Sequence, residues 1–520
     1  MTPEPASGPP ADVRLAPPGD ETIADWLAQR ARLTPQAVYC TFRGNELRCG
    51  ELARDVELMA RRLDAAGVRP GDRVGLMLAT DPLHLVALLA LARLGAVRVP
   101  VNIHLRGAPL QHLLAQLRPQ LLLADAEHRE VLEAAGPLPR LLWRDALLTE
   151  APADTILPPP PAPDDIVTLT LSSGTTGAPK GVRKSDRHLR AGAEAVLRLT
   201  EAGPGDVFLF WEALHHGAGV AVALAALKGG FRLAMVERFS ASRFWDDARA
   251  AGATHVHYLG GVVAMLMKQP PRADDRDHRV RIAWGGGCPP ALWQGFAERY
   301  GVQVREGYGL SELLTFVTMN LGGPVGSIGR PLSHYELRLA DEHGEPVPVG
   351  TIGEITLRAR IPGVGFLGYA DSPEADRAAR RGDWFLTGDR ATQDADGWLT
   401  YAGRGKDMLR RRGINISAWE VEQVIAGHPD VEEVALVGVP GELGDDELLL
   451  YVRPREGRRV DPPGLVRWAE SRLPYFQLPR YVKVIAEFPK TPTQRIQKKD
   501  LPRNTHDAWD LDASGHRVAR

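Results

Sequence analysis

The stretch LSSGTTGAPKG at residues 171–181 combines hydroxyl side chains, glycines and one lysine, and it directly follows the apolar run IVTLTL at residues 166–171. The apolar run predicts a buried β-strand, and the small residues after it predict a loop with exposed backbone N–H groups. Clustered N–H donors and hydroxyls suit phosphate oxygens, and Lys180 adds positive charge. The stretch matches neither the GxxxxGK[ST] nor the GxGxxG nucleotide pattern. It therefore predicts a phosphate-binding loop of another kind.

The sequence around this loop alternates helical patterns with short apolar strands. We expect helices at residues 23–32, 52–67 and 83–95, and strands at residues 38–42, 72–78 and 96–102. Regular alternation of this kind predicts a doubly wound α/β architecture. After residue 350 the chain changes to short strands separated by turn residues, and from about residue 406 a new pattern of helices and strands begins. A domain boundary is expected near residues 404–407.

Composition limits the class of protein. A chain of 520 residues that is 44% hydrophobic can bury a sizeable core in more than one domain. A net charge of −2 gives no overall field that would attract nucleic acid or an anionic membrane. No apolar run approaches the roughly 20 residues of a membrane span. The three cysteines, Cys40, Cys49 and Cys288, are few and odd in number, and they lack the paired spacing of a structural zinc site. This favours a reducing compartment and a cytoplasmic location.

Five stretches of the sequence resemble the motifs of one enzyme superfamily, in its order. They are TLTLSSGTTGAPKGV at residues 168–182, GYGLSE at 307–312, GDWFLTGD at 382–389, GRGKDMLRRRGINIS at 403–417 and PKTPTQRIQKKDL at 489–501. The superfamily is the adenylate-forming one of acyl-CoA synthetases, peptide-synthetase adenylation domains and luciferases. Further stretches, such as VPVNIHLRG and VRIAWGGGCPP, resemble its crotonobetaine/carnitine-CoA ligase-like branch.

The resemblance implies a fold in two parts. A large N-terminal domain of doubly wound α/β subdomains plus a distorted β-barrel would occupy residues 21–403, after a proline-rich, disordered leader at residues 1–20. A small, mobile α+β C-terminal domain would occupy residues 407–520. Between them, residues 404–406 would be a hinge, with Lys406 at the position about which relatives swing the small domain between two poses.

The resemblance also assigns an ATP site. The opening loop would hold the β and γ phosphates, Glu312 would bind Mg²⁺, Tyr308 would lie on the adenine and Ser311 would contact phosphate. The ionised Asp389 can accept hydrogen bonds from both ribose hydroxyls, and Arg404 would contact ribose and phosphate. The nucleotide-binding residues so implied are Ser172, Ser173, Gly174, Thr175, Thr176, Gly177, Lys180, Gly286, Gly287, Cys288, Tyr308, Gly309, Ser311, Asp389 and Arg404.

The acyl and thiol channels are implied by weaker matches. WEALHHGAG at residues 211–219 resembles the PLFHxxG segment, in which the histidine matching His216 lies beside both channels. A histidine at the start of an apolar helix is more often structural. The expected acyl-pocket residues are Trp211, His215, Tyr258, Leu259 and Gly260. Arg410, Gly413 and Asn415 lie in the loop that relatives turn toward the pantetheine channel.

One motif departs from the superfamily. Relatives carry a glycine and a catalytic lysine where this chain has Gln494 and Arg495. Arginine keeps its charge, but its planar fork differs from an ammonium group, so the change is not conservative. Arg495 could serve as the electrostatic clamp between the acid and the α-phosphate, Lys498 could replace it, or adenylation could be impaired. The arginine variant is expected within the ligase branch, which favours an active enzyme.

The resemblance therefore implies an AMP-forming ligase. It would activate an acid with ATP and Mg²⁺, release pyrophosphate and pass the acyl group to coenzyme A. A carrier protein in place of coenzyme A stays open, as does a homodimer. Two alternatives remain: a diazotase of bacterial secondary metabolism, which activates nitrite for transfer to an aromatic amine, and a nucleotide-binding protein without turnover. The sequence does not identify the acid.

Overall fold

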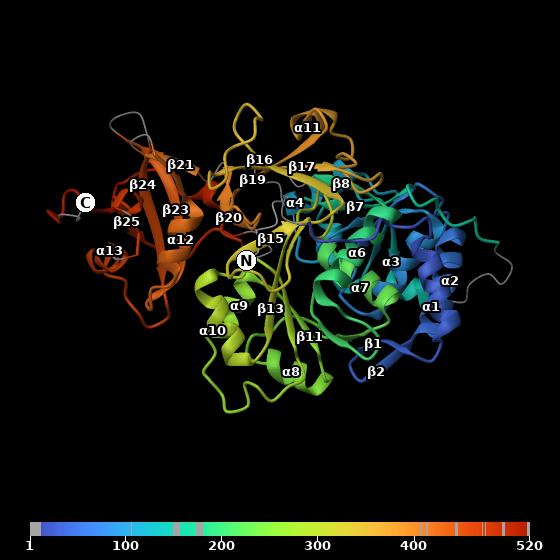
Figure 1. Cartoon of the computed structure of the whole chain (residues 1–520). Helices are drawn as coiled ribbons and strands as arrows, with labels where there is room; N and C mark the ends of the chain where they lie inside the picture. The colour runs from blue at the N-terminus through green and yellow to red at the C-terminus, as the bar shows by residue number, and fades with distance from the viewer. Residues whose placement is uncertain are drawn as a thin grey trace, which may run out of the picture. The chain divides into compact units, whose positions relative to one another are not determined.

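The computed structural model describes residues 12–105, 107–148, 156–172, 180–405, 408–411, 414–441, 446–470, 472–473, 475–490 and 495–516. The chain divides into unit 1, Met1–Leu337 with Leu357–Phe385, and unit 2, Arg338–Thr356 with Leu386–Arg520. Figure 1 colours the chain from blue at the N-terminus to red at the C-terminus, so that each unit can be followed separately.

Sheet 1 of unit 1 contains the strand that leads into the predicted phosphate loop. Its strand order is β6-β5-β3-β4-β7-β8. The strands are β3 (Arg73–Met77), β4 (Val97–Pro100), β5 (Leu121–Ala124), β6 (Arg140–Trp143), β7 (Ile166–Leu171) and β8 (Gly181–Ser185). Only the β7–β8 pair is antiparallel among these neighbours. All four residues of β5, LLLA, are buried, as is typical of parallel strands that are covered on both faces.

Sheet 2 of unit 1 runs in the order β15-β14-β13-β12-β11-β9-β10-β1-β2. Its strands are β1 (Val38–Phe42), β2 (Asn45–Arg48), β9 (Val207–Phe210), β10 (Arg232–Met235), β11 (His255–Leu259), β12 (Ile282–Gly286), β13 (Gln303–Tyr308), β14 (Thr318–Asn320) and β15 (Ser327–Pro331). Strands β1, β10, β9, β11, β12 and β13 are parallel. Their carboxyl ends therefore meet at one edge, where the loops after β9, β11 and β12 come together.

Helices follow most of these strands. They are α1 (Ile23–Leu33), α2 (Cys49–Ala65), α3 (Pro82–Leu94), α4 (Gly107–Leu117), α5 (Arg129–Glu133), α6 (Asp186–Thr200), α7 (Gly217–Gly229), α8 (Phe244–Ala251), α9 (Gly260–Met267), α10 (Pro290–Tyr300) and α11 (Pro373–Ala378). Helices α1, α2 and α3 pack together, and α6 packs on α7 (Figure 1). The strand and helix alternation predicted from the sequence is confirmed, and with it the doubly wound α/β architecture.

Helix α3 shows how sequence signals set a helix and its ends. Asp81 accepts a hydrogen bond from the His84 backbone N–H, Pro82 begins the helix, and Gly95 ends it with a φ of 69°. The left-handed conformation of Gly95 would strain any side chain that replaced hydrogen. Nearly the whole helix is buried, which explains why its sequence lacks a polar stripe.

Unit 2 has its own core. A sheet of order β23-β24-β25-β26 packs with α12 and α13 around buried residues such as Val421, Leu450 and Leu465. These elements are α12 (Ala418–Ala426), β23 (Val431–Pro440), β24 (Asp446–Pro454), α13 (Pro462–Glu470), β25 (Tyr481–Val484) and β26 (Trp509–Asp510). The strands that precede this core in the chain are β16 (Tyr335–Ala340), β17 (Gly353–Ala359), β18 (Arg380–Arg381), β19 (Trp384–Gln393), β20 (Leu399–Arg404), β21 (Met408–Arg411) and β22 (Ile414–Ser417). Strands β16, β17 and β19 each contain residues of both units, β18 belongs to unit 1, and β20, β21 and β22 belong to unit 2.

Part of the expected leader packs against unit 1. Residues 1–11 lie outside the described part of the chain. The backbone N–H of Val13 donates to the Pro331 carbonyl at 2.8 Å, and the Val13 carbonyl accepts from the Ser333 N–H at 2.9 Å. Arg187 donates to the Gly19 carbonyl at 2.9 Å. Residues 13–19 are thus hydrogen-bonded along the fold.

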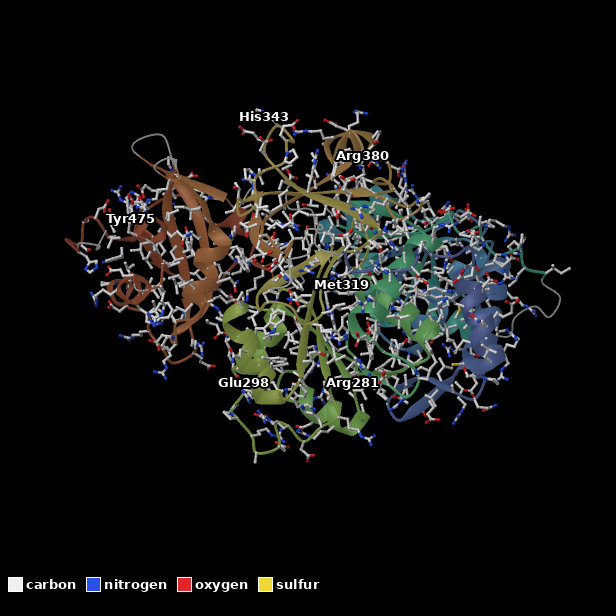
Figure 2. The ribbon with its side chains drawn as sticks, in the orientation of Figure 1. Arg281, Glu298, Met319, His343, Arg380 and Tyr475 are labelled. Atoms are coloured by element: carbon white, nitrogen blue, oxygen red, sulfur yellow. The ribbon has the colours of Figure 1, made fainter. Side chains whose placement is uncertain are left out.

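Figure 2 contrasts interior and surface side chains of unit 1. Met319, on β14, is fully buried, whereas Arg281 and Glu298 project outward (Figure 2).

None of the helices in the described residues has the length and apolar character that a bilayer-spanning segment requires.

A buried ion pair anchors α1, and we predict that breaking it destabilises the protein. Asp186 accepts from Arg190 at 2.7 Å and from the Ile23 N–H at 2.9 Å, and both charged side chains are almost fully buried. Asp186→Asn leaves the Arg190 charge uncompensated, so urea denaturation should show a loss of about 3–5 kcal/mol. Glu237→Ala removes the exposed partner of Arg43 and should cost less than about 1 kcal/mol. Equal losses for the two variants would contradict this account.

Candidate functional site

The two ends of the predicted phosphate loop are joined by hydrogen bonds. The Ser172 backbone N–H donates to the Lys180 carbonyl at 2.9 Å, and the Lys180 N–H donates to the Ser172 hydroxyl at 3.4 Å. These bonds extend the antiparallel β7–β8 pair, whose last register is Leu171 opposite Gly181. Residues 173–179, which include the predicted Ser173, Gly174, Thr175, Thr176 and Gly177, lie outside the described residues. The base of the loop is therefore fixed by strand pairing.

Tyr369, which no sequence motif pointed to, links Glu312 to the base of this loop. The Tyr369 hydroxyl donates to Glu312 Oε1 at 3.0 Å, and the Lys180 Nζ lies 5.0 Å from the centroid of the Tyr369 ring. Tyr369 is held in place by a β-bridge to Val182. Burial and the neighbouring Glu312 raise the pKa of Tyr369, so its hydroxyl stays protonated and donates. A carboxylate and an ammonium group thus flank one ring beside the phosphate loop.

A buried lysine supports the backbone that carries Glu312. The ammonium of Lys184 donates to the Leu313 carbonyl and lies 3.0 Å from His188 Nε2. Burial lowers the pKa of Lys184 to about 7, although the charge of Glu312 acts in the opposite direction. The predicted Ser311 hydroxyl donates to the Leu171 carbonyl at 3.2 Å. The GYGLSE segment is therefore tied to β7 through Ser311, and the residue that follows it is tied to β8 through Lys184.

The turn that follows β12 binds a buried carboxyl group, Glu306. It accepts hydrogen bonds from the Gly287 and Cys288 backbone N–H groups and from the Tyr258 hydroxyl, the last at 2.6 Å. Burial raises the pKa of Glu306 to about 7, while these donors act to lower it. Gly287 has a φ of 80°. No sequence motif pointed to Glu306, which directly precedes the GYGLSE motif.

The predicted adenine-binding turn is sterically restricted. Tyr308 is half-buried at the end of β13, and Gly309 follows it. A Cβ atom on Gly309 would lie 1.9 Å from the Thr315 carbonyl oxygen, closer than any side chain allows. Glycine is therefore required at this turn.

The loop at residues 211–216 is held by a buried contact between Glu212 and His257. Glu212 Oε1 lies 3.0 Å from His257 Nδ1, and Glu212 Oε2 accepts from the Trp211 backbone N–H at 2.9 Å. The Trp211 indole N–H donates to the His257 carbonyl at 3.1 Å, and the two rings stack with an interplanar angle of 23°. The aromatic face of Trp211 is therefore held in one orientation.

The predicted acyl-pocket residues occupy different environments. Tyr258 is 1% exposed and points its hydroxyl into the core, whereas Leu259 is 51% exposed. Gly260 approaches the Gly287 carbonyl so closely that a Cβ would lie 2.1 Å from the oxygen. His215 and His216 lie together, with ring centroids 5.5 Å apart. Burial, and then the neighbouring His216, lower the pKa of His215 to about 3, so this imidazole is neutral.

Unit 2 brings together the two predicted ribose-binding residues. Asp389 on β19 lies opposite Arg404 on β20, with Arg404 Nε 3.0 Å from Asp389 Oδ1. The Tyr401 hydroxyl donates to the same oxygen at 3.0 Å. Asp389 is only 3% exposed, so its charge is compensated by these two partners.

The two candidate clamp residues differ in their surroundings. Lys498 forms an ion pair with Glu422 at 2.8 Å, and Glu422 also accepts from the Leu436 N–H at 2.5 Å. The side chain of Arg495 is exposed. The predicted hinge residue Lys406 and the thiolation-loop residue Gly413 lie outside the described residues, whereas Arg410 and Asn415 are paired across the β21–β22 hairpin.

Comparison with known proteins identifies the family. The model for AMP-binding enzyme matches residues 27–369, and the model for the AMP-binding enzyme C-terminal domain matches residues 420–495. Sulfoacetate–CoA ligase from Cupriavidus necator is 33% identical over 508 residues, covering 94% of this chain and 99% of the relative. Crotonobetaine/carnitine–CoA ligase from Escherichia coli is 29% identical over 476 residues, covering 87% of this chain and 92% of the relative.

A solved structure shares the fold. O-succinylbenzoate coenzyme A synthetase from Bacillus subtilis, in complex with AMP, superposes with a TM-score of 0.84 at 24% identity, covering 93% of this chain and 98% of that chain. The large N-terminal and small C-terminal parts predicted from the sequence are thereby confirmed. The chain belongs to the AMP-binding enzyme family and is an AMP-forming, acyl-CoA synthetase-like ligase.

Proposed function

We propose that this chain joins an acid to coenzyme A in two steps, with the predicted motif residues as its ATP site. The acid carboxylate attacks the α-phosphorus of ATP, a P–O bond forms, and pyrophosphate leaves. The thiol sulfur of coenzyme A then attacks the acyl carbonyl of the adenylate, AMP leaves, and the thiol proton is released. The observation that carries the proposal is the arrangement of Glu312, Tyr369 and Lys180 at the base of the phosphate loop.

Charge explains why this arrangement suits ATP. The reaction brings a carboxylate toward a polyphosphate, so the site must compensate negative charge and align the reacting atoms. Lys180 supplies a cation, and the hydroxyl of Ser172 and the backbone N–H groups of the loop are suited to phosphate oxygens.

The donor set around Glu312 also fits Mg²⁺. Mg²⁺ is typically held by one or two carboxylates together with phosphate oxygens and water. Tyr369 donates to Oε1 of the half-buried Glu312, which leaves Oε2 for a cation. When bound, Mg²⁺ neutralises phosphate charge; Tyr369 orients the carboxylate whether or not the ion is present.

We assign the clamp between acid and α-phosphate to Arg495. Arg495 occupies the sequence position of the relatives' catalytic lysine, and Lys498 is held in a partly buried ion pair with Glu422. A guanidinium can also bridge carboxylate and phosphate oxygens with two parallel hydrogen bonds.

The acceptor we propose for the acyl group is coenzyme A, and a carrier protein is the alternative acceptor. The buried, unpaired thiols Cys40, Cys49 and Cys288 suit the reducing cytoplasm.

The reaction itself is tested by pyrophosphate release with MgATP across short, medium, aromatic, sulfonated and betaine-like acids, each with and without coenzyme A. We expect release with at least one carboxylic acid, rising when coenzyme A is present. Nitrite with an aromatic amine is included in the panel. Release only with that pair would overturn the acid-thiol ligase in favour of a diazotase, and ATP binding without any release would indicate a protein without turnover.

Variants of Glu312 and Tyr369 should separate the effect of the Glu312 charge on catalysis from the effect of its orientation by Tyr369. Glu312→Gln removes the negative charge, and we expect ATP–pyrophosphate exchange to fall by about 100-fold or more. Tyr369→Phe removes one hydrogen bond to a charged group and should lower exchange by about tenfold. Glu336→Gln alters an exposed carboxylate that pairs with Arg358 and serves as the control. Exchange by Glu312→Gln at the wild-type rate would contradict the assigned role.

Arg495→Ala and Lys498→Ala should behave differently. Loss of the clamp should abolish adenylation, while thioester formation from a supplied acyl adenylate should stay within about threefold of wild type, because that step no longer needs the carboxylate and α-phosphate to be drawn together. We expect this pattern for Arg495→Ala alone. Lys499→Ala, in a neighbouring exposed lysine, is the control. The pattern appearing in Lys498→Ala would transfer the role to Lys498, and its absence from both would exclude both.

A further inference from the structure

A fully enclosed arginine joins the two sheets of unit 1. Arg98, on β4 of sheet 1, is 3% exposed. Its Nε donates to the Thr168 hydroxyl at 3.1 Å, and its Nη1 donates to the Leu214 carbonyl at 2.8 Å. Thr168 lies on β7, the strand that leads into the phosphate loop, and Leu214 lies in the loop after β9 of sheet 2. One side chain therefore contacts the segments that precede both predicted substrate sites.

Both backbone groups of Leu214 are held by side chains from sheet 1 and its turns. The Leu214 N–H donates to the Thr80 hydroxyl at 3.4 Å, in the turn before α3, while Arg98 binds the carbonyl. Leu214 is completely buried, so its carbonyl would lack a partner if Arg98 were removed. The His216 N–H closes the turn by donating to the Ala213 carbonyl at 3.0 Å.

The turn is also too crowded to relax easily. A Cβ on Gly219 would lie 2.7 Å from the Ala213 carbonyl, which places the first turn of α7 directly against this segment. His215 and His216 follow Leu214, so their ring positions depend on how the Leu214 peptide is held. Arg98 is the charged group that holds it.

The charge of Arg98 also affects the protonation of His215. Within the described residues, its guanidinium donates to a hydroxyl and a backbone carbonyl, both uncharged. His215 is faced by His216, His84, His104 and Arg98, each of which disfavours its protonation, as burial does most strongly. Burial lowers the pKa of Arg98 to about 10, so it remains a cation at neutral pH. A cation at this place therefore favours a neutral imidazole at His215.

We propose that Arg98 is a positioning residue for acid activation, fixing the turn at residues 213–216 so that His215 and His216 form a rigid wall for the bound acid. This rests on the proposed function, because it takes the turn to line the acyl pocket. Arg98 does not contact the reacting atoms; it acts through the Leu214 carbonyl. Its bond to Thr168 couples this wall to the strand that carries the phosphate loop.

The test compares full-length variants in ATP–pyrophosphate exchange with the best acid from the panel. Arg98→Met keeps much of the volume but removes both donors and the charge. We expect the KM for the acid to rise by about tenfold or more, because displacing a substrate-positioning group is costly, while the KM for ATP stays within about twofold. Arg98→Lys keeps the charge and one donor, and it should recover at least about half of the lost acid affinity on a logarithmic scale.

Two further variants separate positioning from general destabilisation. Arg93→Met removes another arginine that donates to a backbone carbonyl, that of Pro158, and should leave both KM values within about twofold of wild type. Thr80→Val removes the acceptor for the Leu214 N–H and should raise the KM for the acid in the same direction as Arg98→Met. If Arg98→Met does not fold, Thr80→Val and Arg98→Lys still decide the question.

The outcomes separate a failure of the proposed ligase function from a failure of the positioning role of Arg98. Wild-type protein that catalyses no exchange with any acid would contradict the proposed function and the inference with it. An active wild type whose Arg98 and Thr80 variants change the KM for ATP and for the acid equally, or change only the unfolding temperature, would overturn the positioning role of Arg98 alone.

Discussion

The antiparallel pairing of β7 with β8 is the constraint on which the rest of the candidate site depends. It brings Ser172 and Lys180 together at the base of a loop that has almost no side-chain bulk to hold itself. The same strand β8 carries Val182, whose bridge to Tyr369 places a hydroxyl on Glu312. Without this pairing, the cation and the carboxylate would have no fixed relation to the base of the loop.

Buried ionisable side chains then hold the segments that strand pairing does not reach. Lys184 holds the Leu313 carbonyl, Glu212 holds Trp211 and His257, and Glu306 accepts from the Gly287 and Cys288 N–H groups. A buried polar group is costly unless its partners are correctly placed, so each of these groups favours one local conformation. A site that must align two anions benefits from such rigidity, because alignment supplies much of the rate enhancement.

The sequence predicted the local structure well and the long-range contacts poorly. The run IVTLTL became β7 and residues 38–42 became β1, both with the predicted bounds, because apolar runs bounded by turns carry their own signal. Motif order predicted Glu312 and Asp389 as site residues, and these assignments stay predictions. Tyr369 was missed because it is 57 residues from Glu312 and carries no local pattern. Arg98 was missed because it reads as one charge in an apolar strand, 116 residues from Leu214.

The same distinction explains why the acid is harder to assign than the reaction. The predicted ATP-binding residues fall in short motifs, since a loop or strand end presents them directly to a ligand that never changes. The predicted acyl-pocket residue Trp211 is instead oriented by the neighbouring Glu212 and by His257 on β11. Substitutions among such supporting groups reshape a pocket without altering any motif, and each change in an apolar pocket alters selectivity by only about 1–3 kcal/mol. The predicted acyl-pocket residues are therefore positioned by distributed buried contacts, which motif matching does not detect.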